Sequence, residues 1–308
     1  MAKLCEGRIC IVTGAGNGIG REHSMLLAAH GAKVVVNDLG GSMDGTGAST
    51  GPAQAVVDEI EAAGGEAVAN TEDISSWAGA EALVNQAVET YGGLDVVINN
   101  AGILRDRMLA NMTEEEWDAV IKVHLKGTFA PARHAAAYWR DRSKAGEEVD
   151  ARLINTTSVS GIYGNPGQTN YGAAKMGIAA FTIIAAQELQ RYGVTVNAIA
   201  PGALTRMTEG LGGFKQPTPE QQEEMRQKMG PQWIAPIAVW LASKESREVT
   251  GRVFEASGSV LAVAESWHRG PTAEPVLDPE AIGPIAMELV AKARPNADMS
   301  GKDKQPRL

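Results

Sequence analysis

The sequence predicts an α/β fold: one doubly wound parallel sheet with helices on both faces. Short apolar runs such as RICIVT and KVVVN alternate with helical patterns along most of the chain, which favours such a sheet over two separate domains. The 308 residues include 35 glycines, in keeping with many tight turns between strands and helices. A glycine-rich segment, TGAGNGIG, joins the first apolar run to the first helical pattern.

The first forty residues are expected to form a strand, a glycine turn, a helix and a second strand. Residues 8–13 are a short apolar run suited to a buried strand. Residues 21–30 carry a helical pattern with its apolar residues on one side, and Gly31 follows its end. Residues 33–37 form the second buried strand, which Asp38 closes.

Later segments continue the alternation. A capping box of Thr113 and Glu116 begins a long helix expected to run to Tyr138. The polar, helix-prone segment 205–230 is expected to cover the substrate. The other strands are expected at 66–70, 94–99, 152–157, 195–200 and 252–255, the last of the sheet, and the other helices at 52–63, 75–89, 171–191 and 233–243.

One large domain is expected at residues 1–269, followed by an extension at residues 270–308. The extension contains a helical pattern at 279–293 and a polar end. No apolar run in the sequence reaches the length of a membrane span, and charged residues interrupt any signal-peptide core near the first residue. We therefore expect no association with a membrane.

The net charge of −9 argues against a nucleic-acid partner, although a local basic patch can still bind an anionic substrate. The only cysteines, Cys5 and Cys10, suggest neither a disulfide framework nor a metal site, and they fit a reducing compartment. The chain ends in QPRL, which is not a peroxisomal signal. We therefore expect a cytoplasmic protein without a metal.

The most informative chemical pattern is Tyr171-x-x-x-Lys175, with Ser158 thirteen residues before the tyrosine. Residues four apart on a helix share a face, so the phenol and the ammonium point the same way. A nearby cation lowers the pKa of a phenol, which is about 10 in a free tyrosine. With the Ser158 hydroxyl as a third group, the set can remove or return the proton of an alcohol. Each residue taken alone is more often structural.

The glycine turn indicates where a hydride acceptor binds. Backbone amides at a glycine turn and a helix N-terminus bind phosphate, although a glycine turn alone also serves any tight bend. Asp38, after the second strand, can accept hydrogen bonds from ribose hydroxyls. Its carboxylate would repel a 2′-phosphate, and no lysine or arginine follows it in LGGSMDG. The pattern therefore predicts NAD rather than NADP.

Together these motifs resemble the short-chain dehydrogenase/reductase family, whose fold is Rossmann-like. The matching segments are TGAGNGIG at 13–20, Asp73-Ile74, NNAG at 99–102, Ser158, the Tyr171–Lys175 pair and Pro201-Gly202. Further segments are similar to the 3-hydroxyacyl-CoA dehydrogenase part of peroxisomal multifunctional enzymes, a subgroup also described as 17β-hydroxysteroid dehydrogenases. They are VVVNDLGG, NNAGILRDR, VHLKGTF, SGIYGNPGQTNY and VFEASGS.

The resemblance implies roles for particular residues. Tyr171 is the acid and base, Ser158 orients the substrate oxygen, and Lys175 also holds the nicotinamide ribose. Substrate contacts are implied for Ile162, Tyr163, Gln168 and Arg206. The implied NAD-binding residues are Gly14, Gly16, Asn17, Gly18, Ile19, Gly20, Asp38, Asp73, Ile74, Asn100, Ala101, Gly102, Lys175, Pro201, Gly202 and Thr205.

Two implied roles have alternatives. Asp73 is either an adenine contact or the cap of the following helix. His124 stands where many relatives carry a catalytic asparagine. It can keep only the backbone role of that position, join a proton relay through its ring, or simply pack beside the site.

The leading functional expectation is an NAD-dependent enzyme that interconverts the alcohol and ketone of a 3-hydroxyacyl-CoA, either a fatty acyl or a sterol side-chain ester. The alternatives are a hydroxysteroid dehydrogenase acting on a free steroid alcohol, an NADPH-dependent 3-oxoacyl reductase, and a non-catalytic NAD-binding regulator. The resemblance also implies a homotetramer or homodimer built on the two long helices.

Overall fold

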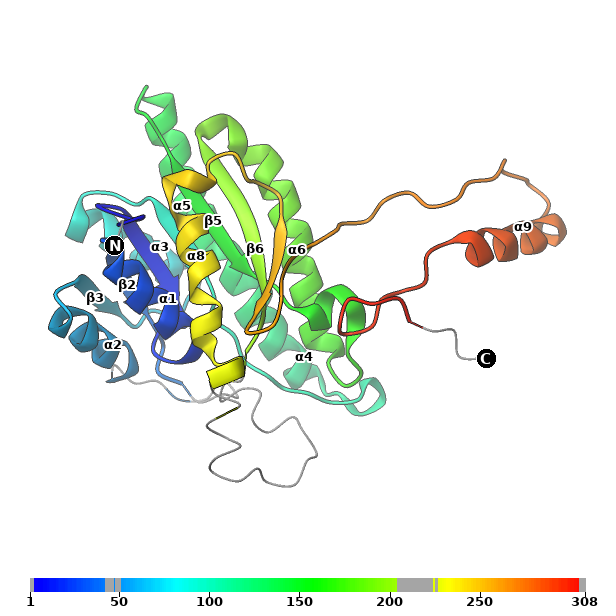
Figure 1. Cartoon of the computed structure of the whole chain (residues 1–308), viewed down its shortest axis with the longest axis horizontal. Coiled ribbons are helices and arrows are strands. Elements are labelled where there is room, and N and C mark those ends of the chain that lie inside the picture. The colour runs from blue at the N-terminus through cyan, green and yellow to red at the C-terminus, as the bar shows by residue number, and fades with distance from the viewer. Residues whose placement is uncertain (1–2, 42–46, 48–50, 204–223, 225–226, 305–308) are drawn as a thin grey trace. The chain divides into compact units, whose positions relative to one another are not determined.

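The computed structural model describes residues 3–41, 47, 51–203, 224 and 227–304. The chain separates into two compact units, Met1–Ala264 and Glu265–Leu308. The sequence predicts the end of the first domain at residue 269, close to this division. Within the first unit, strands and helices alternate as the sequence predicts, and Figure 1 shows them as one sheet covered by helices.

The first unit contains a single eight-stranded sheet, which confirms the predicted fold class. The strand order is β3-β2-β1-β4-β5-β6-β7-β8, and the order reverses between β1 and β4. All neighbours pair in parallel except β7 and β8. The strands are β1 (Ile9–Thr13), β2 (Lys33–Asn37), β3 (Glu66–Asn70), β4 (Val96–Asn99), β5 (Ala151–Thr156), β6 (Val194–Gly202), β7 (Val253–Ser257) and β8 (Leu261–Ala264).

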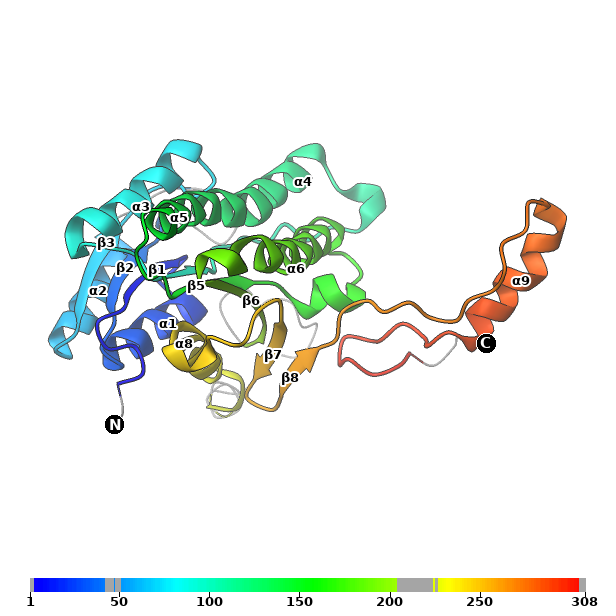
Figure 2. The same cartoon turned by 90° about the horizontal axis from the view of Figure 1, so that it is seen from above.

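Helices cover both faces of this sheet (Figure 2). The α-helices are α1 (Gly18–Ala29), α2 (Gly51–Ala62), α3 (Trp77–Tyr91), α4 (Glu114–Ile121), α5 (Gly127–Lys144), α6 (Thr169–Leu189), α8 (Ala235–Ala242) and, in the second unit, α9 (Pro279–Lys292). Two π-helical segments, Lys122–Lys126 and Ser160–Gly164, lie next to α4 and α6 in the sequence.

Successive strand residues point to opposite faces, and this alternation divides the core in two. On one face Val12, Val36 and Ile98 pack against side chains of α1, α2 and α8. On the other face Ile11 and Val35 pack against side chains of α3, α5 and α6. The strands are therefore buried on both sides, which explains why they read as continuous apolar runs rather than as alternating ones.

The helix predicted from Thr113 to Tyr138 is interrupted. The capping box of Thr113 and Glu116 is present, but the helix widens into the π-helical segment at residues 122–126 before it resumes as α5 and continues to Lys144. A π-helical turn accommodates an extra residue and changes the direction of the side chains. His124 lies at the centre of this turn.

The prediction that residues 252–255 form the last strand is wrong. After β7 the chain turns, with the Ser257 amide donating to the Val260 carbonyl at 2.8 Å, and returns as β8, antiparallel to β7. Leu261 is 71 % exposed. Since β8 pairs on one side only and buries little, its sequence lacks the signature of a buried strand.

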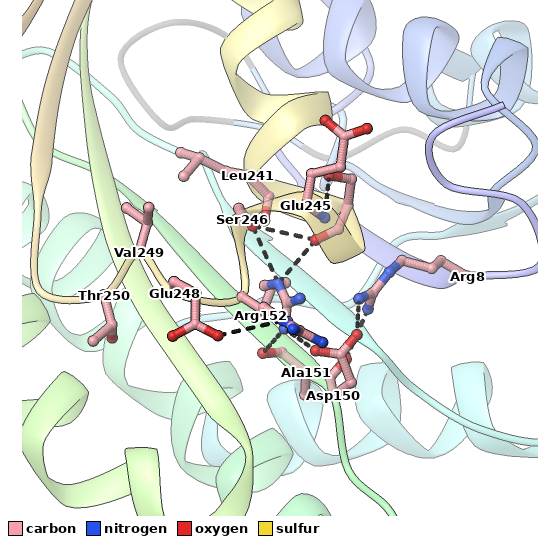
Figure 3. Close-up of polar contacts among 12 residues, drawn as sticks. Arg8, Asp150, Ala151, Arg152, Leu241, Glu245, Ser246, Glu248, Val249 and Thr250 are labelled. Carbon is pink, nitrogen blue, oxygen red and sulfur yellow. Dashed lines mark hydrogen bonds and ion pairs between the residues drawn. The ribbon is translucent and has the colours of Figure 1, made fainter. Parts of the chain in front are cut away.

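At the amino-terminal edge of the sheet, the carboxylate of Asp150 pairs with two buried arginines, Arg8 and Arg152 (Figure 3). Asp150, just before β5, accepts a hydrogen bond from Arg8 Nη2 at 2.6 Å and forms an ion pair with Arg152 Nη1 at 2.6 Å. Arg152 Nε also donates to the Ser243 carbonyl at 3.1 Å. Two cavities, of about 280 and 170 Å³, flank this cluster, and Asp150 lines both.

The second unit consists of extended segments and α9. Asp278 caps α9 by accepting a hydrogen bond from the Glu280 amide at 2.9 Å. None of the described residues in this unit is fully buried. Burial of apolar side chains within the unit therefore contributes little to its stability.

Candidate active site

The glycine turn after β1 leads directly into the N-terminus of α1. Gly14 and Gly18 have positive φ angles of 61° and 53°, which other residues rarely adopt. No side chain caps the N-terminus of α1, and its first turn has no acidic residue. The first amides of α1 are therefore available to an anion. This arrangement fits the pyrophosphate of a dinucleotide.

Asp38 lies beside this turn, as the sequence predicts. Its carboxylate accepts hydrogen bonds from the amides of Gly16, at 2.8 Å, and Gly40, at 2.7 Å. A Cβ on Gly16 would come within 2.9 Å of the Asp38 carboxylate and 2.6 Å of Pro52. Only glycine therefore lets the turn approach Asp38 so closely, and the negative charge is fixed where an adenosine ribose would lie.

The segment after β4 is tied to the glycine turn. The Asn100 side-chain amide donates to the carbonyls of Thr13, at 3.0 Å, and Gly14, at 3.1 Å. The Thr13 hydroxyl accepts from the amides of Asn100 and Ala101. Asn100 is therefore a structural clamp in the free protein, and Ala101 packs against Gly14, where a Cβ would lie 2.6 Å from its Cα.

Asp73 does not cap the helix that follows it. The cap of α3 is Ser76, whose hydroxyl accepts from the Gly79 amide at 3.4 Å. Asp73 instead accepts from the amide and the hydroxyl of Ser75, at 2.9 and 2.6 Å. Ile74 is 7 % exposed and packs against Gly127, the first residue of α5.

Ser158, Tyr171 and Lys175 come together at the carboxyl-terminal edge of the sheet. Ser158 follows β5, and the other two lie on the first turns of α6. The Lys175 ammonium donates to the Thr156 carbonyl at 2.7 Å and lies 5.5 Å from the centre of the Tyr171 ring. The Ser158 hydroxyl lies close enough to the Tyr171 phenol to oppose the rise of its pKa. The predicted trio is thus brought together at one site.

The pKa values of Tyr171 and Lys175 differ from those that the sequence pattern suggests. Burial raises the pKa of Tyr171 to about 12, against the opposing effect of the Ser158 hydrogen bond. Burial also lowers the pKa of Lys175 to about 7. The buried lysine is therefore partly neutral near neutral pH, and burial, not the lysine, sets the direction in which the pKa of the phenol shifts.

His124 reaches this site from the π-helical turn. Its Nε2 lies 2.7 Å from the Ile103 carbonyl oxygen and 3.1 Å from the Ile103 amide nitrogen, so the backbone of Ile103 holds the ring in place. The ring stands edge to face against Tyr171. Burial and, secondarily, Lys175 lower the pKa of His124 to about 3. The imidazole is therefore neutral and does not exchange a proton near neutral pH.

The predicted substrate residues differ in what they are free to do. Gln168 is 6 % exposed, and its amide is engaged at both ends: Nε2 donates to Asp106 at 2.7 Å, and Oε1 accepts from Asn165 at 2.9 Å. Tyr163 donates to the Glu255 carboxylate. Ile162 is partly buried against β6.

Several predicted site residues need only a brief placement. Asn17 precedes α1, Ile19 and Gly20 lie in its first turn, and Gly102 abuts the His124 ring. Pro201 and Gly202 end β6 and pair with β7. Thr205 and Arg206, like most of the segment 205–230, lie outside the described residues.

Three residues that matter to this site were not predicted. Ile103 supplies the carbonyl that holds His124. Asp106 accepts a hydrogen bond from the Gln168 side chain. Asn170 is fully buried, accepts from the Tyr171 amide at 2.7 Å and donates to the carbonyls of Arg105 and Glu116. The asparagine beside Tyr171 was a usable signal, but the other two act through contacts distant in sequence.

Among the described residues, no group of three or more histidine, cysteine, aspartate or glutamate side chains is arranged to hold a metal ion. No described helix is long and apolar enough to cross a membrane. The two cavities of the amino-terminal edge lie at the opposite end of β5 from Ser158, and they belong to the arginine cluster rather than to this site.

Comparison with known proteins places this geometry in context. Residues 8–214 match the family model described as short chain dehydrogenase. A hydroxyacyl-CoA dehydrogenase, ChsB1, of Mycobacterium tuberculosis is 46 % identical over 268 residues, covering 85 % of this chain and 81 % of that protein. A crystal structure of a short chain dehydrogenase from Mycobacterium avium superposes with a TM-score of 0.85 at 53 % identity, covering 96 % of this chain and 98 % of that one.

Longer relatives match as well. A peroxisomal hydratase-dehydrogenase-epimerase of Neurospora crassa is 41 % identical over 264 residues. The match covers 86 % of this chain but only 27 % of that protein. The shared part is therefore about a quarter of the fungal protein.

Proposed function

Because this chain belongs to the short-chain dehydrogenase family, and is therefore an oxidoreductase, we propose that it interconverts a secondary alcohol and a ketone with NAD. The proposed substrate is a 3-hydroxyacyl-CoA, either a fatty acyl or a sterol side-chain ester. The observation that carries the proposal is the convergence of Ser158, Tyr171 and Lys175 at the same carboxyl-terminal edge of the sheet as the glycine turn and Asp38.

The residues of the chain divide the reaction between them. A nicotinamide dinucleotide, the cofactor class of this family, supplies the hydride acceptor when bound. In oxidation the Tyr171 phenolate takes the proton of the substrate hydroxyl as the carbon-bound hydrogen leaves as hydride. In reduction the phenol returns that proton to the oxygen of the ketone. Ser158 orients this oxygen by a hydrogen bond, and acid–base help of this kind accelerates a reaction by about 10²–10⁴-fold.

The protonation states give the two directions different requirements. A phenol whose pKa is raised to about 12 is protonated near neutral pH and is ready to act as an acid. Oxidation needs the phenolate, which positive charge beside the ring favours. Lys175 supplies part of that charge, and the fraction that it supplies falls as the pH rises above its pKa of about 7.

We assign His124 a positioning role rather than a place in a proton relay. The ring supports Tyr171, and its Nε2 is held against the backbone of Ile103. The wide turn that presents this ring also fixes the backbone at the position where many relatives carry an asparagine.

The preference for NAD over NADP rests on Asp38. Its two oxygens are already held by the amides of Gly16 and Gly40, so the carboxylate cannot turn away from a 2′-phosphate. Unscreened repulsion at short range disfavours that phosphate. Asp73 and Ile74 are proposed to lie against the adenine, since they follow β3 at the same edge of the sheet.

The substrate class rests on the relatives. The mycobacterial relative is named a hydroxyacyl-CoA dehydrogenase, which favours a CoA ester over a free steroid. Of the predicted substrate residues, Ile162 and Tyr163 keep that role in our proposal. Gln168 is instead proposed to hold Asp106, because its amide nitrogen and its amide oxygen both already make hydrogen bonds within the protein.

One set of assays tests the function. The purified protein is given NAD or NADP with a 3-hydroxyacyl-CoA, the corresponding free hydroxy acid and a steroid alcohol, and the absorbance of reduced cofactor is followed. We expect turnover with NAD and the CoA ester, and a loss of about 10²–10⁴-fold in Tyr171→Phe with NAD binding retained. Tight NAD binding without turnover of any alcohol would instead identify a regulator.

The assembly of the chain and its location in the cell are also proposals. Phe129 on α5 and Ile184 on α6 are 43 % and 56 % exposed, which suits a homodimer or homotetramer built on these helices. Light scattering that gives the mass of a monomer would contradict this. A cytoplasmic location is likewise our proposal, and fractionation of cells expressing the chain tests it.

A further inference from the structure

Asp106 is a carboxylate near the proposed site that the reaction described above does not use. It lies in the segment between β4 and α4. One oxygen, Oδ2, accepts from Gln168 Nε2 at 2.7 Å. The other, Oδ1, is buried and has no hydrogen-bond partner. Burying a carboxylate oxygen without a hydrogen-bond donor costs free energy. The surrounding fold must therefore hold Asp106 in this position.

The segment that carries Asp106 is anchored to the start of α6, where Tyr171 lies. The Arg107 amide donates to the Gly167 carbonyl at 2.8 Å. The buried Asn170 side chain donates to the Arg105 carbonyl at 3.0 Å and accepts from the Tyr171 amide at 2.7 Å. Residues on both sides of Asp106 are therefore tied to the turn that bears the phenol, and the carboxylate cannot swing into solvent.

We propose that Asp106, fixed by Gln168, is a positioning residue that places a negative charge beside Tyr171 and restrains ionisation of its phenol. The inference rests on the proposed dehydrogenase function of the same site. It assigns Asp106 to the control of the direction and pH range of the reaction, without contact to the substrate.

The groups that face Tyr171 from each neighbouring element support this assignment. The end of β5 presents the neutral Ser158, and the π-helical turn presents His124, which is neutral above about pH 3. Lys175, on the same helix, is a cation only below its pKa of about 7. The segment after β4 presents Asp106 as the anion. The Arg107–Glu116 ion pair lies on the exposed side of that segment, with Arg107 53 % exposed.

The electrostatics agree with the geometry. After burial, which has the largest effect, and the Ser158 hydrogen bond, which opposes it, the charge of Asp106 raises the pKa of Tyr171 further. Burial raises the pKa of Asp106 itself, against the effect of the Gln168 hydrogen bond. Asp106 thus favours the protonated phenol, the form that reduction needs, and oxidation is displaced towards higher pH.

The decisive variant is Asp106→Asn, in which Gln168 can still donate to the remaining oxygen. We expect the alkaline rise of NAD-dependent oxidation to move to lower pH by about 0.5–1 unit. Gln168→Met should move it in the same direction by less, since without that hydrogen bond the carboxylate is no longer fixed in this position. Asp141→Asn, at the far end of α5 and with a side chain 64 % exposed, should leave the profile unchanged.

A second measurement does not depend on turnover. The ultraviolet absorbance of tyrosinate is followed against pH in the NAD complex, as the difference between each protein and its Tyr171→Phe counterpart. Tyr171 should ionise at lower pH in Asp106→Asn than in the parent. If no alcohol is turned over but this shift is present, the proposed function fails and the role of Asp106 stands. If the phenol of folded Asp106→Asn ionises as in the parent, the role of Asp106 is overturned.

Discussion

The imidazole ring of His124 meets the phenol ring of Tyr171 edge to face, with the ring centres 5.1 Å apart and the planes at 89°. Such a contact is worth about 0.5–1.5 kcal/mol beyond the buried area. It joins a π-helical turn to the first turn of α6, so the phenol is supported from a separate element. The contact is geometric rather than protonic, because burial lowers the pKa of His124 to about 3 and keeps its ring neutral.

Replacing His124 by alanine should therefore lower kcat by about tenfold, through loss of support for the phenol ring, while the affinity for NAD is retained. The pH profile between about pH 5 and 9 should keep its shape, because a group whose pKa is lowered to about 3 does not titrate there. Steady-state kinetics across this range give both results. An ionisation that disappears from the profile of His124→Ala would instead mean that the ring relays protons.

The charge of Asp38 and its hydrogen bonds can be separated by substitution. Asp38→Asn keeps one acceptor for the turn amides but removes the negative charge. We expect the ratio of kcat/KM for NAD to that for NADP to fall by about tenfold, or ~1.4 kcal/mol, mainly through a gain with NADP. Asp58→Asn on α2 serves as a control for loss of one charge. An unchanged cofactor ratio would show that repulsion by Asp38 does not select the cofactor.

Lys175 makes the stability of the ligand-free protein depend on pH. Its pKa is lowered to about 7 in the folded state and is about 10.4 in an unfolded chain. Between these values the unfolded chain holds more protons, so this group makes stability rise with pH from about 7 to about 10. The cost of burying the charge, a few kcal/mol, is fully present below about pH 7.

Lys175→Met should therefore be stabilised relative to the parent near about pH 6, and this difference should shrink as the pH approaches about 10. Urea unfolding of both proteins at several pH values measures it, and the other titrating groups cancel in the comparison. A difference that does not vary with pH would show that Lys175 keeps an ordinary pKa in the folded protein.

Asp150 should be worth more to stability than an ordinary surface carboxylate. Asp150→Ala leaves Arg8 and Arg152, which are 4 % and 1 % exposed, without their carboxylate. Removing one partner of a buried pair costs 3–5 kcal/mol, and we expect about 3 kcal/mol here because Asp150 is itself 34 % exposed. Chemical unfolding measures the loss, and Asp141→Asn should change stability by less than about 0.5 kcal/mol.

Sequence patterns were sufficient for the parts of the molecule that depend on local signals. The strands at 33–37 and 66–70 have the predicted bounds, because buried parallel strands carry unbroken apolar runs. The helical spacing of Tyr171 and Lys175 likewise placed both residues at one site. The capping box at Thr113 was also found where its two side chains indicate it.

What could not be predicted depends on contacts between distant segments. The segment VHLK reads as an ordinary helix, and its π-helical turn is evident only in the structure, where His124 meets Ile103 and Tyr171. Asp106 lies 62 residues from Gln168, and neither residue belongs to a periodic pattern that points to the other. The pKa of Tyr171 is raised rather than lowered, because burial has the largest effect on it and burial cannot be read from spacing.

The arginine cluster and the reacting groups occupy opposite ends of β5, before Ala151 and after Thr156. Substitutions that reinforce one end therefore leave the geometry of the other end unchanged. Stabilising substitutions at the amino-terminal end can first raise the free energy of unfolding. This added stability can then offset the destabilising substitutions that reshaping a substrate pocket usually requires.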